Sequence, residues 1–202
     1  MTIRVKICGL TSVDDARAAA QAGADAVGLV FVARSARCVD IPTARALADS
    51  LPPFINRVGL FMNHQPDEIE NVLAHVPLDT LQFHGDEPPE FCARFNRPWI
   101  KALAMSDEQE PDWDGWRSAQ ALLLDSHGGG TLGGSGHRFD WSRVPRLDRF
   151  WILAGGLTPG NVAEACQQLQ PDAVDVSSGV EKSPGIKDHR LMQEFIKVVR
   201  NA

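Results

Sequence analysis

Apolar and polar residues follow two patterns that alternate from one end of the chain to the other. Apolar or strictly alternating runs are typical of β-strands, and most are followed by apolar residues at i, i+3, i+4 and i+7, as in amphipathic helices. The predicted strands are residues 4–10, 24–31, 56–62, 79–84, 99–105, 119–126, 149–154 and 172–177. The predicted helices are residues 12–21, 42–51, 65–76, 89–95, 141–147, 158–170 and 188–200.

Eight strands separated by helical segments, without a linker-like stretch, predict a parallel α/β fold. The number eight favours a single closed (β/α)8 TIM barrel over an open doubly wound sheet. Residues 106–118 are acidic and show no helical period, so we interpret them as a degenerate fifth helix. The 202 residues suit one domain, residues 1–202, and are few for such a barrel, which predicts short loops and trimmed helices.

Composition narrows the choice of partners and compartment. The net charge of −6, without a basic cluster, argues against a nucleic-acid partner. The first strand begins within a few residues of the N-terminus and no apolar run approaches about 18 residues, so we expect no signal peptide, no membrane span and a cytoplasmic location. Cys8, Cys38, Cys92 and Cys166 lack the spacing of a metal pair or a CxxC motif, which predicts neither a metal site nor a disulfide framework.

The first predicted strand brings a thiol to the place where such a barrel does its chemistry. Val5 and Ile7 should face one side and Lys6 and Cys8 the other, with Gly9 ending the run. Active sites of (β/α)8 barrels lie at the carboxyl ends of the strands. A thiolate there can act as a base or nucleophile if a nearby cation, such as Lys6, lowers its pKa. The alternative is a small buried thiol without a chemical role.

The sixth predicted strand ends in an acid after Leu122, Leu123 and Leu124. An apolar setting raises the pKa of a carboxyl group, as a general acid requires, so Asp125 is the second catalytic candidate. The alternative is that Asp125 only bonds local loop amides. Residues 127–136 contain six glycines and follow this acid, and we interpret them as a mobile lid rather than a flexible linker.

Small residues follow the seventh and eighth predicted strands. Gly155 and Gly156 come after the seventh, and Ser177, Ser178 and Gly179 come after the eighth. Such residues let backbone N–H groups approach an anion, and these two loops are where (β/α)8 barrels often bind phosphate. The pair of motifs therefore predicts a small phosphorylated substrate.

Three more polar residues lie at or near predicted strand ends. Arg37 is a candidate to bind a carboxylate or stack on an aromatic ring, unless it is a solvated surface arginine. Gln82 and His84 share one face of the fourth strand, which is the lumen side if the register is as predicted. His84 is equally interpretable as a hydrogen-bonded structural histidine.

Seven motifs in order along the whole chain resemble phosphoribosylanthranilate isomerase, an enzyme family of the tryptophan pathway. They are residues 5–10 (VKICGL), 81–85 (LQFHG), 123–126 (LLDS), 133–141 (GGSGHRFDW), 154–157 (AGGL), 175–181 (DVSSGVE) and 184–188 (PGIKD). The chain departs from the family pattern at Ala36, where proline is usual, and at Phe83, where leucine is usual.

The resemblance implies a cofactor-free Amadori rearrangement of N-(5-phosphoribosyl)anthranilate to 1-(2-carboxyphenylamino)-1-deoxyribulose 5-phosphate. It implies Asp125 as the general acid that protonates the ribose ring oxygen, and Cys8 as the general base that removes the C2′ proton. It also implies Arg37 at the anthranilate group and Asp175 as a support for the reacting groups. The phosphate would lie against Gly155, Gly156, Ser178 and Gly179.

Proteins with other functions would have different residues at the strand ends. A ribulose-phosphate epimerase usually needs paired His and Asp metal ligands, and indole-glycerol-phosphate synthase relies on catalytic lysines and a glutamate, whereas Cys8 and Asp125 occupy the corresponding places here. A barrel that only binds a phosphorylated ligand would keep the phosphate loops without requiring that pair. The sequence leaves the choice between monomer and homodimer open.

Overall fold

The computed structural model describes residues 2–105, 111–126 and 140–202, and its centre is a closed barrel of eight parallel strands. The strands pair in sequence order, and the last closes on the first, with Lys6 beside Asp175. They are β1 (Arg4–Cys8), β2 (Ala26–Val30), β3 (Asn56–Phe61), β4 (Thr80–Phe83), β5 (Trp99–Ala104), β6 (Ala121–Asp125), β7 (Trp151–Leu153) and β8 (Ala173–Val176). The predicted (β/α)8 barrel is therefore confirmed.

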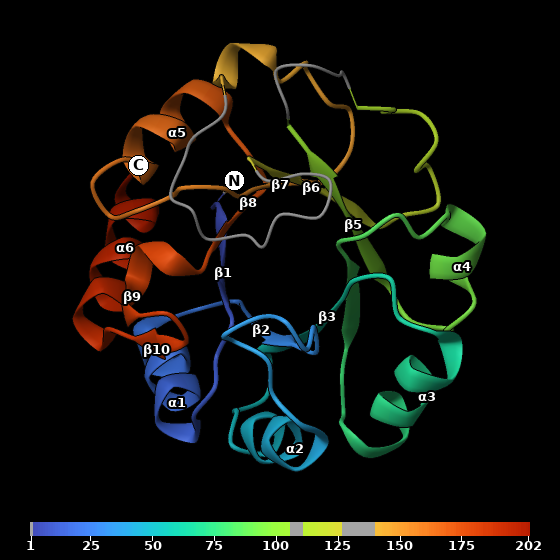
Figure 1. The fold of residues 1–202 in the computed structure, drawn as a ribbon. Helices are drawn as coiled ribbons and strands as arrows, with labels where there is room; N and C mark the ends of the chain where they lie inside the picture. The colour runs from blue at the N-terminus through green and yellow to red at the C-terminus, as the bar shows by residue number, and fades with distance from the viewer. Residues whose placement is uncertain (1, 106–110, 127–139) are drawn as a thin grey trace.

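Helices surround the barrel on its outside (Figure 1). They are α1 (Val13–Ala22), α2 (Ile41–Asp49), α3 (Pro66–His75), α4 (Pro89–Ala93), α5 (Val162–Leu169) and α6 (His189–Asn201). After β5, the described residues 111–118 form turns only, in agreement with a degenerate fifth helix. In the ranges the structure describes, no helix combines the length and the apolar character needed to cross a membrane.

Strand alternation divides the apolar residues between two cores. Val5, Ile7 and Leu122 face outward into the core between barrel and helices. Leu123, Ile152 and their neighbours fill the barrel lumen. Because neighbouring side chains of a strand point to opposite faces, Lys6 and Cys8 face the lumen, on the side opposite Val5 and Ile7 as predicted.

Local side chains fix where the early helices begin and end. Ser12 caps α1 by accepting a hydrogen bond from the Asp15 N–H at 3.1 Å, and Gly23 ends the helix with φ of 96°. Asp40 caps α2 by accepting from the Thr43 N–H at 2.9 Å. These caps satisfy backbone groups that a helix terminus leaves without partners. They hold the turns that follow β1 and precede α2 close to the barrel mouth.

Three details differ from the sequence-based prediction. The helix expected over residues 158–170 begins at Val162, because Asn161 takes the capping position and its Oδ1 accepts from the Thr158 N–H at 2.8 Å. The helix expected over residues 141–147 is a single 3₁₀ turn, η1 (Trp141–Arg143), because Pro145 has no N–H to continue it. The third is an unpredicted short hairpin.

That hairpin follows β8 and a 3₁₀ turn, η2 (Ser178–Val180). Its strands, β9 (Glu181–Ser183) and β10 (Ile186–Lys187), are antiparallel and lead into α6. Gly185, with φ of 83°, makes its turn. The hairpin returns Lys187 to the end of β8, where it joins the site described next.

Candidate active site

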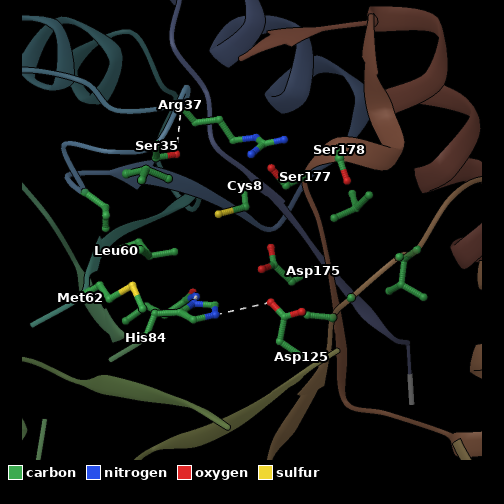
Figure 2. A pocket seen from close by; sticks show the side chains of 18 residues that line it. Cys8, Ser35, Arg37, Leu60, Met62, His84, Asp125, Asp175, Ser177 and Ser178 are labelled. Carbon is green, nitrogen blue, oxygen red and sulfur yellow. Dashed lines mark hydrogen bonds and ion pairs between the residues drawn. The ribbon is translucent and has the colours of Figure 1, made fainter. Parts of the chain in front are cut away.

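One cavity opens at the carboxyl ends of the barrel strands and encloses about 820 Å³ of space, part of it open to solvent. A volume of this size suits a small organic ligand. Ten predicted site residues line it: Cys8, Arg37, Gln82, His84, Asp125, Gly155, Gly156, Asp175, Ser177 and Ser178 (Figure 2). The topology therefore brings together residues from both ends of the sequence.

Cys8 lies at the end of β1 beside a buried ion pair. The Lys6 Nζ and Asp175 Oδ1 atoms are 3.0 Å apart, and their side chains are 4% and 9% exposed. The neighbouring position on β2 is Gly28, and a Cβ built there would lie 2.6 Å from the Cys8 Sγ and 3.1 Å from the Lys6 Nζ. The absence of a side chain at Gly28 therefore makes room for the thiol and the ammonium group.

Burial and charge act on Cys8 in opposite directions. Burial raises the pKa of the Cys8 thiol and outweighs the attraction of Lys6 and Lys187, which lowers it. The pKa of Lys6 is raised, because its attraction to Asp175 and Cys8 exceeds the effect of burial. Lys6 thus stays charged next to the thiol. It does not, however, bring the pKa of Cys8 below the ordinary value, as the sequence analysis suggested a cation could.

Arg37 belongs to a second charged cluster at the edge of the cavity. Its Nε donates to Glu181 Oε1 and its Nη2 to Glu181 Oε2, both at 2.7 Å. The Lys187 Nζ lies 2.7 Å from the same Glu181 Oε1 and 3.1 Å from the Ser177 carbonyl oxygen. Arg37 and Lys187 hold the pKa of Glu181 below its usual value despite burial, which acts the other way.

Glu181 and Lys187 were not predicted as site residues. Both belong to motifs that carry the family resemblance, but neither lies at a strand end of the predicted barrel. Lys187 is 1% exposed, and burial lowers its pKa. A lysine in a Gly-Ile-Lys-Asp run gives no sign of burial, so only the hairpin fold reveals its position.

On the opposite side of the mouth, Gln82, His84 and Asp125 form a row from β4 to β6. Gln82 Nε2 and His84 Nδ1 are 3.2 Å apart, and His84 Nε2 and Asp125 Oδ2 are 3.5 Å apart (Figure 2). Gln82 is fully buried and Asp125 is 8% exposed. The lumen register predicted for Gln82 and His84 is therefore confirmed, and His84 borders the cavity as well as bonding to a neighbour.

Apolar side chains form the wall between these two sides. Val30, Val32, Leu60 and Met62 line the cavity, and with Cys8 they make a small hydrophobic cluster at the mouth. A flat apolar ring can bury its faces against such a wall. None of the four was singled out from the sequence, because apolar residues at strand ends look like ordinary core.

The two glycine- and serine-containing loops take different roles. Gly155 and Gly156 have φ of 83° and 61°, and both line the cavity with Ser177 and Ser178. Gly179 does not line it. A Cβ at Gly179 would collide with the carbonyl oxygen of Leu157, so its missing side chain lets the β7 and β8 loops pack together. The proposed lid, residues 127–136, lies outside the described residues.

Cys92 and Cys166 are buried thiols and Cys38 is exposed, and all four cysteines are free. Within the described ranges, no group of three or more His, Cys, Asp or Glu side chains is placed to hold a metal ion.

The fold and the cavity define a (β/α)8 barrel with a small-molecule site at its mouth, lined by a thiol and a carboxyl group. The family model for N-(5′-phosphoribosyl)anthranilate isomerase matches residues 5–198. The isomerase of that name from Acidithiobacillus ferrooxidans is 54% identical over 200 residues, covering 98% of each protein.

Two solved structures extend the comparison. A phosphoribosylanthranilate isomerase in complex with reduced 1-(o-carboxyphenylamino)-1-deoxyribulose 5-phosphate has a TM-score of 0.85 and 39% identity, covering 99% of this chain and 100% of that one. A monomeric form of the dimeric isomerase from Thermotoga maritima has a TM-score of 0.84 and 37% identity, with coverage of 99% and 100%. This chain belongs to the N-(5′-phosphoribosyl)anthranilate isomerase family of tryptophan biosynthesis.

Proposed function

We propose that this isomerase uses Asp125 as its general acid and Cys8 as its general base, without a metal or organic cofactor. The observation that carries the proposal is that these two side chains, 117 positions apart by their residue numbers, line one cavity at the carboxyl ends of β1 and β6. An acid and a base at separate points of one small site can serve two proton transfers on one bound molecule.

The reaction begins at the ribose ring. Protonated Asp125 gives its proton to the ring oxygen, the bond between that oxygen and C1′ breaks, and the nitrogen lone pair forms a C=N bond to C1′. The result is an open-chain iminium. The cation at C1′ makes the neighbouring C2′–H acidic, so a base of moderate strength can remove this proton.

The Cys8 thiolate takes the C2′ proton, and the released electron pair forms the C1′=C2′ double bond and neutralises the iminium nitrogen. The resulting enolamine loses its hydroxyl proton and gains one at C1′, which gives the 2-ketone. The product has the same atoms as the substrate. The charge environment of Cys8 supports this role, because Lys6 and Lys187 both favour the thiolate and the adjoining iminium adds a further positive charge during the reaction.

The remaining site residues divide between the two ends of the substrate. We place the phosphate against the loops of Gly155, Gly156, Ser177, Ser178 and Gly179, where small residues allow close backbone approach. Gly179 then contributes through its backbone or through loop packing.

We place the anthranilate ring on the Val32–Leu60–Met62 wall, with its carboxylate toward Arg37. Glu181 holds the Arg37 guanidinium by two hydrogen bonds and so fixes its plane. Gln82, His84 and Asp175 border the space left for the ribose.

Replacing the two proton-handling groups tests the assignment. Cys8→Ser and Asp125→Asn are each expected to lower kcat by at least about a hundredfold, the range for a general acid or base. Cys38→Ser and Asp67→Asn make the same chemical changes at exposed positions and should keep full turnover. Near-normal turnover in either site variant would reject its proposed role.

Alkylation of Cys8 provides a second test on the intact active site. In a Cys38→Ser background, the cysteines other than Cys8 are buried in helices, and the pKa values of Cys92 and Cys166 are raised to about 12 and about 11 by burial. Iodoacetamide should inactivate the enzyme more quickly as the pH rises, and product should protect it. Full activity after stoichiometric labelling of Cys8 contradicts the proposal.

We further propose that residues 1–202 work as one domain in the cytoplasm, since the barrel, its outer helices and one short hairpin account for the described strands and α-helices, and four free thiols suit a reducing compartment. A partner other than the phosphorylated substrate is not required by the site, and nucleic acid in particular is not expected. The T. maritima relative is described as dimeric, and sedimentation of this protein decides between monomer and homodimer.

A further inference from the structure

Gln82 is a buried amide with one satisfied end and one unsatisfied end. Its side chain is fully buried at the cavity wall, and its Nε2 lies 3.2 Å from the Nδ1 of His84. Its Oε1 has no hydrogen-bond partner among the described residues. A buried amide oxygen without a partner costs free energy, so this position suits a donor carried by a bound molecule. The cavity that Gln82 borders supplies the place for it.

The satisfied end of the amide determines the state of the imidazole. With the amide in this orientation, Gln82 Nε2 donates and the Nδ1 of His84 offers its lone pair. A neutral imidazole with an acceptor at Nδ1 carries its proton at Nε2. This proton points toward Asp125, whose Oδ2 lies 3.5 Å from the His84 Nε2. That separation is long for a hydrogen bond, and catalytic hydrogen bonds commonly shorten when substrate closes the site.

We infer that Gln82 and His84 are positioning residues for Asp125, with Gln82 fixing His84 as the Nε2–H tautomer and His84 fixing which carboxyl oxygen of Asp125 delivers the proton. The inference rests on the proposed role of Asp125 as general acid. With Oδ2 accepting from His84, the transferable proton stands on Oδ1. After the transfer, the same His84 N–H stabilises the carboxylate that is left.

The unsatisfied Oε1 of Gln82 connects the row of Gln82, His84 and Asp125 to the substrate. It accepts one N–H or O–H group of the bound molecule, such as a ribose hydroxyl or the anilino N–H. The Gln82 amide then accepts a hydrogen bond from the substrate with its oxygen and fixes the imidazole tautomer with its nitrogen. A ligand that lacks the donor leaves a buried acceptor unpaired, which is a strong basis for discrimination.

The other ionisable groups that the structure describes around His84 leave this assignment unchanged. Cys8, Arg37 and Asp175 also line the cavity, and Lys6 stands beside Cys8 and Asp175. Behind β4 and β5, Lys101 and Glu87 form a buried pair with Nζ and Oε2 3.1 Å apart, and both bond the backbone of Gly85. This outer pair fixes the backbone that follows His84, and it does not contact the imidazole through any described bond.

The tautomer can be measured without turnover. In protein labelled with ¹⁵N-histidine, the His84 signals are identified by their loss in His84→Gln. We expect wild-type Nδ1 to show the shift of an unprotonated nitrogen and Nε2 that of a protonated one. Gln82→Glu, which places an acceptor at Nδ1, should move the proton to that nitrogen, and Gln82→Met should give a mixture. A protonated Nδ1 in the wild-type protein overturns the inference.

The effect on Asp125 is read from the pH profile of kcat. His84→Leu removes a donor that favours the ionised form of Asp125. The limb of the profile that reports loss of the Asp125 proton should therefore move to higher pH, while the other limb stays in place. Turnover should fall about ten- to a hundredfold, as for the loss of a hydrogen bond to a charged group. His84→Gln, which again offers an N–H, should restore the limb toward its wild-type position.

Matched substitutions separate this effect from a loss of structure. His75→Leu and Gln168→Met are the same changes at exposed helix positions, and neither should alter the profile. A fall in turnover with both limbs unmoved in His84→Leu shows a structural role only and rejects the inference. Retained activity in Asp125→Asn rejects the proposed acid instead, and the NMR result distinguishes that failure from this one.

Discussion

The two sides of the cavity differ in the kind of polar side chain that they present. The side formed by β1, β8 and the hairpin has two buried charged clusters, Lys6 with Asp175 and Glu181 with Arg37 and Lys187. The side formed by β4 and β6 presents an amide, an imidazole and a carboxyl group in a row. Lys6 and Lys187 favour the Cys8 thiolate against the effect of burial, whereas Asp125 has an imidazole and an amide on its side of the cavity.

The side formed by β4 and β6 also has a buried ion pair, but it lies on the other face of the sheet. Lys101 points outward from β5, where its Nζ meets Glu87 and stands 4.8 Å from the centre of the Trp116 ring. Glu87 Oε1 and Oε2 accept from the backbone N–H groups of Asn63 and Gly85 at 2.6 and 2.9 Å. We infer that the face of the sheet on which a buried pair lies decides whether the pair affects the chemistry or only the backbone.

Breaking the lumen pair should have the largest effect. Lys6→Met leaves Asp175 buried without its cation and removes the nearest charge from Cys8. We expect a loss of about 3–5 kcal/mol in the free energy of unfolding, as for one broken buried pair, and a fall in kcat of at least about a hundredfold. Urea unfolding and steady-state kinetics measure the two quantities.

The double variant Lys6→Met/Asp175→Asn separates those two effects. It should regain most of the stability, because no unpaired charge remains, while turnover stays low because the cation is still missing. Recovery of turnover together with stability would contradict the role of Lys6 at the thiol.

Breaking the outer pair should cost similar stability with little chemical consequence. Glu87→Gln leaves Lys101 buried without its partner, which we expect to lower the free energy of unfolding by about 3 kcal/mol. Because the pair faces away from the lumen, kcat should change by less than about threefold and its pH profile should keep its shape. If kcat falls as far as in Lys6→Met, the distinction between the two faces is wrong.

The hairpin cluster should make stability depend on acid. The pKa of Glu181 is held below its ordinary value of 4.5, so its contribution to stability is present above that pH and is lost as the pH falls through the lower, folded-state value. Glu181→Gln should cost about 2–4 kcal/mol at pH 7, because Arg37 and Lys187 lose their shared partner.

The difference between Glu181→Gln and wild type should shrink below pH 4.5, where the wild-type carboxylate begins to lose its charge. Urea unfolding followed at several pH values measures it. A difference that stays constant down to pH 3 would show that this carboxylate is not what makes the protein acid-sensitive.

The smallest expected effect comes from the glycine opposite Cys8. Gly28→Ala places a Cβ against the thiol and the Lys6 ammonium group, so either must shift. Overpacking of this kind costs about 1–3 kcal/mol, and we expect kcat to fall about tenfold. Gly160→Ala is the control, because its nearest atom, the Thr158 Oγ1, would be 3.7 Å away. Equal kinetics in the two variants would remove Gly28 from the site.

Much of the fold and of the site was predictable, because their signals are local. Alternation in β1 placed Lys6 and Cys8 on the lumen face, and the triple leucine of β6 predicted a buried strand ending at Asp125. The small residues after β7 (Gly155 and Gly156) and after β8 (Ser177 and Ser178) predicted the two loops that line the cavity. The start of α5 was predicted too early because Thr158 is a good capping residue, whereas in the structure the Thr158 N–H donates to Asn161 Oδ1 across a turn that precedes the helix.

The succession of strands and helices, the face on which each strand residue lies, and the family could all be read from the sequence, since they depend on spacing between near neighbours. Three features needed the folded structure: Lys187 returns under β8 to share Glu181 with Arg37, Gly179 packs two loops together, and Gln82 has an oxygen at the cavity without a partner among the described residues. Burial and pairing of polar groups arise from contacts across the closed barrel, and a residue's own neighbours in the chain do not encode them.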